Sequence, residues 1–153
     1  MNIPIWAAGG ITNALLNLQS ADLSAELLAD ALAKTNRFSG RTPEPWSVAQ
    51  HSVLVEALSP PELRPWALLH DAHEAFIGDM TSPAVDFISC VARKPDLNES
   101  IALAKGRLDR AIGAAWGVAV RSVNHELRRA DGIALQAEAI CFLGAEPVLF
   151  DPH

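Results

Sequence analysis

The sequence has few of the features that mark secreted, membrane-spanning or nucleic-acid-binding proteins. Its two cysteines, Cys90 and Cys141, fit a reducing compartment and form no Cys-x-x-Cys pair for a zinc knuckle or a redox centre. The apolar runs are far shorter than the ~20 residues that span a bilayer, and no secretion signal is recognisable after Met1. The net charge of −6 argues against binding to a nucleic-acid backbone. We therefore expect a cytoplasmic protein that contacts neither a membrane nor a nucleic-acid polymer.

Apolar residues are abundant instead. They make up 50% of the chain and charged residues 20%, a composition that excludes intrinsic disorder. Helix signals dominate, alternating strand patterns are scarce, and the length of 153 residues suits one domain. The sequence predicts a single compact all-α domain over residues 1–153, with a core at about 23–142 and an extended or irregular N-terminal arm that includes Ile11–Leu18.

Capping and turn residues divide the chain into predicted helices. Ser47 and Gln50 form a capping box that opens one helix. Gly78 and Gly117 are placed to end two others. The predicted helices cover residues 23–32, 47–58, 60–77, 82–91, 96–117 and 123–142.

Four residues with metal-binding side chains lie in three of these helices. They are His51, the adjacent pair His70 and Asp71, and Asp131. Imidazole nitrogens and carboxylate oxygens together suit divalent ions such as Zn, Mn, Co, Fe or Ni. Two histidines and two aspartates also leave positions open for water or substrate, as a catalytic metal requires. Each residue alone has an ordinary structural explanation, such as a buried histidine or a surface ion pair, so their joint occurrence carries the prediction.

The predicted helix around His70 places several polar groups together. At about 100° per residue, His70, Asp71 and Glu74 share one face, and Glu74 can sit beside a metal-bound water. His73 falls about 60° to the other side of His70, at the margin of that face. Contact with substrate and an ordinary hydrogen-bonded or exposed state both stay open for His73.

The order of these residues resembles that of the HD-domain metal-dependent phosphohydrolases, a helical superfamily. The similarity is closer to the small bacterial 5'-deoxynucleotidases and their phage relatives, which include deoxyadenosine triphosphate triphosphohydrolases. It spans roughly residues 23–142 and is carried by Asn36-Arg37-Phe38-Ser39-Gly40, Trp46–Ser52, Leu69–Asp79 and Arg129-Ala130-Asp131, with Leu135 and Glu138 downstream.

The resemblance implies a role for each matching position. The four candidate ligands would bind one divalent metal, whose identity stays open among Co, Mn, Zn, Ni and Fe. Glu74 would orient or deprotonate the attacking water, and Asp79 would hold the substrate sugar or act with the water. Arg37 would contact phosphate, and Phe38 would lie near the base or sugar.

Two positions depart from the family's pattern. Gln50 precedes the first histidine where relatives often carry Glu, and Phe38 stands where the deoxynucleotidases have Trp beside the arginine. The resemblance therefore does not imply that this chain discriminates between sugars as the deoxynucleotidases do. For Arg41, phosphate contact and a solvent-facing position stay open.

Other conspicuous residues receive structural interpretations. We expect Trp66 and Trp116 in the core. Trp46, just before the helix that begins near Ser47, could be a hydrophobic staple or part of the pocket wall, and we favour the staple. Glu138 shares a helix face with Asp131, and we expect it to form a salt bridge.

The sequence thus predicts a metal-dependent nucleotide phosphohydrolase, a 5'-nucleotidase for deoxynucleoside monophosphates. The alternative is a deoxynucleoside triphosphate triphosphohydrolase. Remoter alternatives are a di-iron HD oxygenase, which needs further ligands for a second iron, and a non-catalytic nucleotide-binding domain. The expected partner is a small-molecule nucleotide. Because relatives commonly form dimers or hexamers, we also expect a homo-oligomer.

Overall fold

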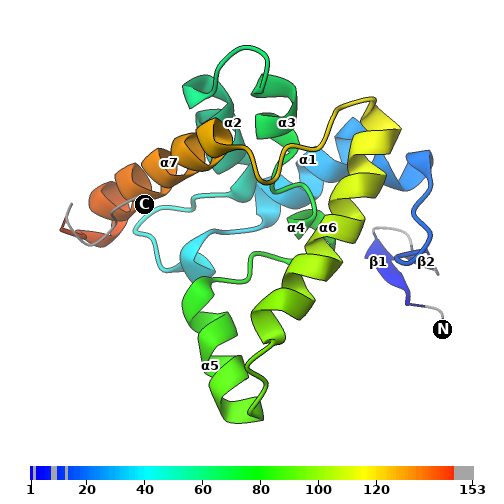
Figure 1. The fold of residues 1–153 in the computed structure, drawn as a ribbon, viewed down its shortest axis with the longest axis horizontal. Helices are drawn as coiled ribbons and strands as arrows, with labels where there is room; N and C mark the ends of the chain where they lie inside the picture. Colours follow the sequence, from blue (N-terminus) through cyan, green and yellow to red (C-terminus); the bar gives the residue numbers. More distant parts are fainter. Residues whose placement is uncertain (2, 8–9, 13, 147–153) are drawn as a thin grey trace.

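The computed structural model of the chain consists mainly of helices. The structure describes residues 1, 3–7, 10–12 and 14–146. Its α-helices are α1 (Ala25–Lys34), α2 (Val48–Leu58), α3 (Arg64–Leu69), α4 (Glu74–Ile77), α5 (Ser82–Ala92), α6 (Leu97–Trp116) and α7 (His125–Leu143) (Figure 1). Two short 3₁₀ turns, η1 (Ser20–Leu23) and η2 (Phe38–Gly40), precede α1 and α2. The prediction of a single all-α domain is confirmed.

Local capping fixes the helix ends that the sequence predicts. At the start of α2, the Ser47 hydroxyl accepts a hydrogen bond from the Gln50 amide, and the Gln50 side chain accepts one from the Ser47 amide. At the C-terminal end of α6, Gly117 adopts a left-handed φ of 64°, which residues other than glycine adopt only with strain. The Asn124 side chain accepts from the first amides of α7.

The predicted continuous helix over 60–77 is wrong. Helix α3 ends at Leu69 and α4 begins at Glu74. Between them the amide of Ala72 donates to the Leu69 carbonyl and that of Glu74 to the Asp71 carbonyl, both at 2.9 Å. These i→i+3 bonds form a turn tighter than an α-helix, so the rule of about 100° per residue does not apply between His70 and Glu74.

The N-terminal arm is more regular than the sequence predicts. Strand β1 (Ile5–Ala7) pairs in antiparallel fashion with β2 (Gly10–Thr12). Strands of three residues are too short for an alternating pattern to be recognised in the sequence. The expectation of an irregular arm is therefore corrected for the first part of the chain.

Helix α2 lies at the centre of the packing, against α1, α3 and α7 (Figure 1). Its residues Val48 and Val55 are fully buried, and Trp66 of α3 is 2% exposed, as predicted. Trp116 is not in the core. It is 40% exposed, and its indole N–H donates to the Leu23 carbonyl at 2.8 Å. Within the described residues, no helix is long and apolar enough to cross a membrane.

Helix α6 is held closely to the loop that follows it. A Cβ atom on Gly113 would lie 2.8 Å from both the Val118 carbonyl oxygen and Val120 Cγ2. One on Gly106 of the same helix would meet only the end of the flexible Arg110 side chain, at 3.4 Å.

We therefore expect Gly113→Ala to lower the free energy of unfolding by about 1–3 kcal/mol, because the contact overpacks backbone. Gly106→Ala should instead be neutral or stabilising by up to about 1 kcal/mol, since alanine favours the helix. Urea unfolding of the two variants measures this difference. Equal effects would contradict the close packing at Gly113.

Candidate functional site

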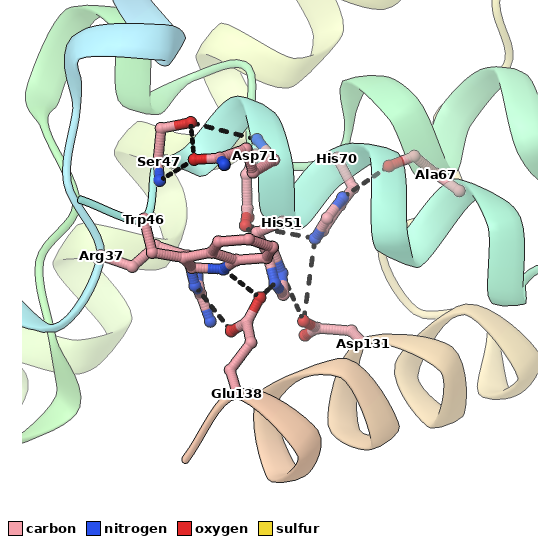
Figure 2. Close-up of polar contacts among 10 residues, drawn as sticks. Arg37, Trp46, Ser47, His51, Ala67, His70, Asp71, Asp131 and Glu138 are labelled. Atoms are coloured by element: carbon pink, nitrogen blue, oxygen red, sulfur yellow. Dashed lines mark hydrogen bonds and ion pairs between the residues drawn. The ribbon is translucent and has the colours of Figure 1, made fainter. Parts of the chain in front are cut away.

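The four predicted metal ligands converge, although they come from α2, the turn after α3, and α7 (Figure 2). His51 Nε2 lies 3.0 Å from Asp131 Oδ1 and 3.6 Å from Asp71 Oδ2. His70 Nε2 lies 3.2 Å from Asp71 Oδ2 and 3.9 Å from Asp131 Oδ1. Two nitrogens and two oxygens therefore face one common point.

The separations between these atoms suit one bound cation. Divalent ions bind such nitrogens and oxygens at roughly 2.0–2.2 Å, so two ligands of one ion that subtend 90–110° lie about 3.0–3.5 Å apart. The separations of 3.0–3.9 Å fall at or slightly above that range. Among the described residues, His70 Nε2 is also buried without a hydrogen-bond partner. This cluster of histidine and aspartate can hold a metal ion.

Both imidazoles are oriented so that Nε2 faces the common point. The other ring nitrogen of His51, Nδ1, lies 2.7 Å from Glu138 Oε1. Nδ1 of His70 lies 2.7 Å from the Ala67 carbonyl oxygen, to which it donates. Carboxylates and carbonyls in these positions fix the tautomer of metal-binding histidines and leave the Nε2 lone pair for the metal.

The charges of the cluster compensate one another. Burial lowers the pKa of His70, but Asp71 and Asp131 outweigh it and raise the pKa well above 6.5. The pKa of His51 is raised for the same kind of reason, through Asp131 and Glu138 against burial. Burial raises the pKa values of Asp71 and Asp131, but the neighbouring imidazoles outweigh it and hold both pKa values far below the usual range. Without a metal, the cluster holds protons where a cation would bind.

Glu138 connects this cluster to the loop between α1 and α2. One carboxylate oxygen accepts from the Trp46 indole at 2.8 Å and contacts His51, and the other accepts from Arg37 Nε at 2.9 Å. The predicted salt bridge of Glu138 is thus confirmed. The prediction that Trp46 forms a hydrophobic staple is wrong. A staple needs an apolar residue at the fourth position of the helix, and that position is occupied by His51. The Trp46 ring contacts Phe142 of α7, with centroids 5.0 Å apart.

A cavity of about 790 Å³ opens beside the cluster. Asp71 and Asp131 line it, and so do the predicted substrate-binding residues Arg37, Phe38 and Asp79. The cavity also has cationic and apolar groups that include Arg41, Lys105, Met80, Phe87 and Leu135. Burial raises the pKa of the Asp79 carboxyl. Two of the four candidate metal ligands and the phosphate-binding candidates therefore line one cavity.

The cavity wall includes a strained stretch of backbone. Phe38 and Ser39 both have φ of 54°, which side chains other than glycine adopt at a cost, and Gly40 follows at 72°. The turn is fixed at its base, where the Arg37 amide donates to the Trp46 carbonyl at 2.8 Å. The guanidinium of Arg37 lies 5.3 Å from the centre of the Phe38 ring. Strain of this kind is concentrated at functional sites.

Glu74 is buried rather than open to the cavity. It is 5% exposed and does not line the cavity, and its Oε2 has no hydrogen-bond partner in the part of the chain that the structure describes. Burial and the carboxylates of Asp71 and Asp79 raise the pKa of Glu74 to about 9. In the metal-free chain Glu74 is therefore protonated at neutral pH, and positive charge nearby is needed before it can accept a proton.

Two residues of α6 complete the surroundings of the site, and the sequence reasoning did not find them. Asp109 Oδ1 lies 2.8 Å from His73 Nδ1, and both side chains are buried. Lys105, one turn earlier, lines the cavity. They share a helix face with buried Leu108 and Ile112, which is the signal that could have indicated them. His73 is thus a hydrogen-bonded, buried histidine.

Comparison with known proteins adds similarity without an activity. No family model matches the chain. The chain is 40% identical to YfdR, an uncharacterized protein of Escherichia coli strain K12, over 62 residues that make up 40% of this chain and 35% of YfdR. It is 31% identical to the uncharacterized protein RCAP_rcc00048 of Rhodobacter capsulatus over 137 residues, 82% of this chain and 65% of that protein. The chain therefore spans less than two thirds of either relative.

We expect Glu138→Gln to weaken divalent cation binding about 10–100-fold, because His51 loses the carboxylate that orients it. Titration of the metal-free protein with Mn²⁺ measures the affinity. Glu126→Gln, on the exposed side of α7, is the matched control and should leave the affinity unchanged. Equal affinities of the two variants would contradict the orienting role of Glu138.

The stability of the metal-free protein should depend on pH in a definite direction. His51 and His70 have folded pKa values above 6.5, so their stabilisation is complete below pH 6.5 and is lost as pH rises through those values. Glu74 acts in the same direction between its ordinary 4.5 and about 9. Asp71 and Asp131 stabilise above their ordinary 3.8 and lose this contribution as pH falls below it.

Urea unfolding from pH 5 to pH 9 with a chelator should therefore show the free energy of unfolding falling as pH rises. Mn²⁺ should oppose the fall, because a cation binds neutral imidazoles and competes with their protons. A stability of the metal-free protein that is constant or rises over this range would contradict the raised pKa values.

Proposed function

We propose that this chain is a metal-dependent nucleotide phosphohydrolase of the HD-domain type that acts on deoxynucleoside monophosphates. The observation that carries the proposal is the convergence of His51, His70, Asp71 and Asp131 at the edge of a cavity lined by Arg37. A cation held there, beside a guanidinium and an apolar wall, suits a ligand with a phosphate at one end and a base at the other.

The bound cation would supply Lewis-acid stabilisation of a phosphoryl oxygen and a lowered pKa for water. Around it, the side chains of the cavity divide the remaining work. Arg37 is held through Nε by Glu138, so its terminal nitrogens are left to donate to phosphate oxygens. Phe38 offers a ring face to the base or sugar, and Asp79 offers oxygens to the sugar hydroxyl.

Glu74 would hold the proton that leaves the attacking water. Its carboxyl group lies close to that of Asp71, with ligand atoms within 4.8 Å. With a cation held at the cluster, the pKa of Glu74 that burial has raised would fall, so that its carboxylate would accept a proton only when the site is occupied. A positioned acid or base of this kind contributes about 10²–10⁴ in rate.

A triphosphate substrate is the second candidate. Besides Arg37, the side chains of Arg41 and Lys105 line the same cavity. These three positively charged side chains can bind more than one phosphate group. They favour a deoxynucleoside triphosphate as substrate, from which triphosphate is released.

Product analysis with Mn²⁺-loaded protein tests both candidates. With deoxynucleoside monophosphates we expect orthophosphate, and with deoxynucleoside triphosphates the second candidate predicts tripolyphosphate. His70→Gln should abolish either activity together with metal binding at the four-residue cluster, whereas His125→Gln, on an exposed residue, should leave both unchanged.

No product from either substrate class across Mn²⁺, Co²⁺, Zn²⁺, Ni²⁺ and Fe²⁺ would overturn the proposal. Nucleotide binding without turnover in the same experiments would indicate a binding domain instead.

A further inference from the structure

A second group of metal-binding side chains lies beside the first and shares one member with it. Asp71, His73 and Glu74 each present a ligand atom within 4.8 Å of the others. The tight turn after α3 produces this arrangement, because it brings the three side chains of one short stretch together. The proposed function gives no role to His73.

Two buried atoms of this group lack partners. His73 is 4% exposed and Glu74 is 5% exposed, and both His73 Nε2 and Glu74 Oε2 are without a hydrogen bond among the described residues. Buried polar atoms are almost always paired. An imidazole nitrogen and a carboxylate oxygen left unpaired on adjacent residues, in a group whose ligand atoms lie within 4.8 Å of one another, indicate a ligand that both residues can bind.

His73 is also held in the manner of a metal-binding histidine. Its Nδ1 lies 2.8 Å from Asp109 Oδ1, which leaves Nε2 as the free nitrogen. His51 is held in the same way by Glu138, at 2.7 Å. Carboxylates that orient the second nitrogen are characteristic of metal-binding histidines. Each of the two groups thus has its own buried orienting carboxylate.

We propose that Asp71, His73 and Glu74 bind a second divalent cation, with Asp71 shared between the two sites. Asp71 Oδ2 faces His51 and His70, which leaves Oδ1 for the second ion. One nitrogen and two carboxylate oxygens suit Mn²⁺, Fe²⁺, Zn²⁺ or Co²⁺. The proposal rests on the proposed function only through the metal site that contains Asp71.

A second cation would be compatible with the proposed role of Glu74 as a proton acceptor. A carboxylate has two oxygens, so Glu74 can bind the ion through Oε2 and still accept a proton through Oε1. Paired cations are suited to substrates whose attacking and leaving oxygens both carry charge, as in phosphate esters.

The stoichiometry of Mn²⁺ binding tests the proposal. The full chain is stripped with a chelator and dialysed against Mn²⁺, and bound Mn is counted per chain. We expect two ions per wild-type chain. Low-temperature electron paramagnetic resonance should show the spin coupling of two Mn²⁺ ions that share a carboxylate.

His73→Gln should reduce the count to one ion and replace the coupled spectrum with that of an isolated Mn²⁺. Asp109→Asn, which keeps the side-chain volume, should weaken the second ion about tenfold or more without removing the first. It carries the test if His73→Gln does not fold. The matched control His125→Gln should bind two ions.

The outcomes separate the second site from the first. One Mn²⁺ per chain in wild type, unchanged in both His73→Gln and Asp109→Asn, would overturn the second site and leave the proposed function intact. Loss of binding in wild type would overturn both. Two uncoupled ions that both remain bound in His73→Gln and in Asp109→Asn would also overturn the shared site.

Discussion

The arrangement of the site depends on one buried carboxylate. Glu138 accepts hydrogen bonds from Arg37 and Trp46 and contacts His51, so it joins α7 to α2 and to both ends of the loop between α1 and α2. Burial raises the pKa of Glu138, but His51 and Arg37 outweigh it and keep the pKa below its usual value. A buried charge is tolerated only when paired in this way. The same contacts that stabilise Glu138 therefore orient a candidate metal ligand, His51, and hold a phosphate-binding candidate, Arg37.

The second determinant is the tight turn after α3. If α3 continued as a regular helix, His70 and Asp71 would still share a face, but Glu74 would lie at a different position relative to them. The i→i+3 bonds at Ala72 and Glu74 place His70 against the Ala67 carbonyl and leave Asp71 between two groups of side chains. The turn thereby makes one aspartate a neighbour of both clusters.

Local signals were sufficient to predict most helix boundaries. The capping box at Ser47 and the glycines Gly78 and Gly117 act through their own backbone and nearest neighbours, so sequence alone reveals them. The break after Leu69 could not be predicted in this way. No glycine or proline marks it between Leu69 and Glu74, and the choice between i→i+3 and i→i+4 bonds there depends on tertiary packing. The short β1–β2 pair escaped prediction because its strands are too brief for a period to appear.

The site shows the same division between local and tertiary information. The four metal-ligand candidates were predicted from residue type and order, and the structure brings them together. Asp109 and Lys105 were missed, because the helix face that they share with Leu108 and Ile112 indicates that they lie near the core but not which residues they contact. Trp46 was misassigned because its partner, Glu138, lies 92 residues away in the sequence.

The exposure of Asp131 affects which metal ion would occupy the site. Its side chain is 45% exposed, whereas that of His51 is fully buried, so solvent reaches the cluster most readily at Asp131. An ion bound there would exchange with ions in solution. Imidazole and carboxylate ligands bind several first-row divalent metals, and which one is bound depends in part on which metals are available. The metal that accompanies the protein would then reflect supply, and the growth medium would become a variable of the preparation.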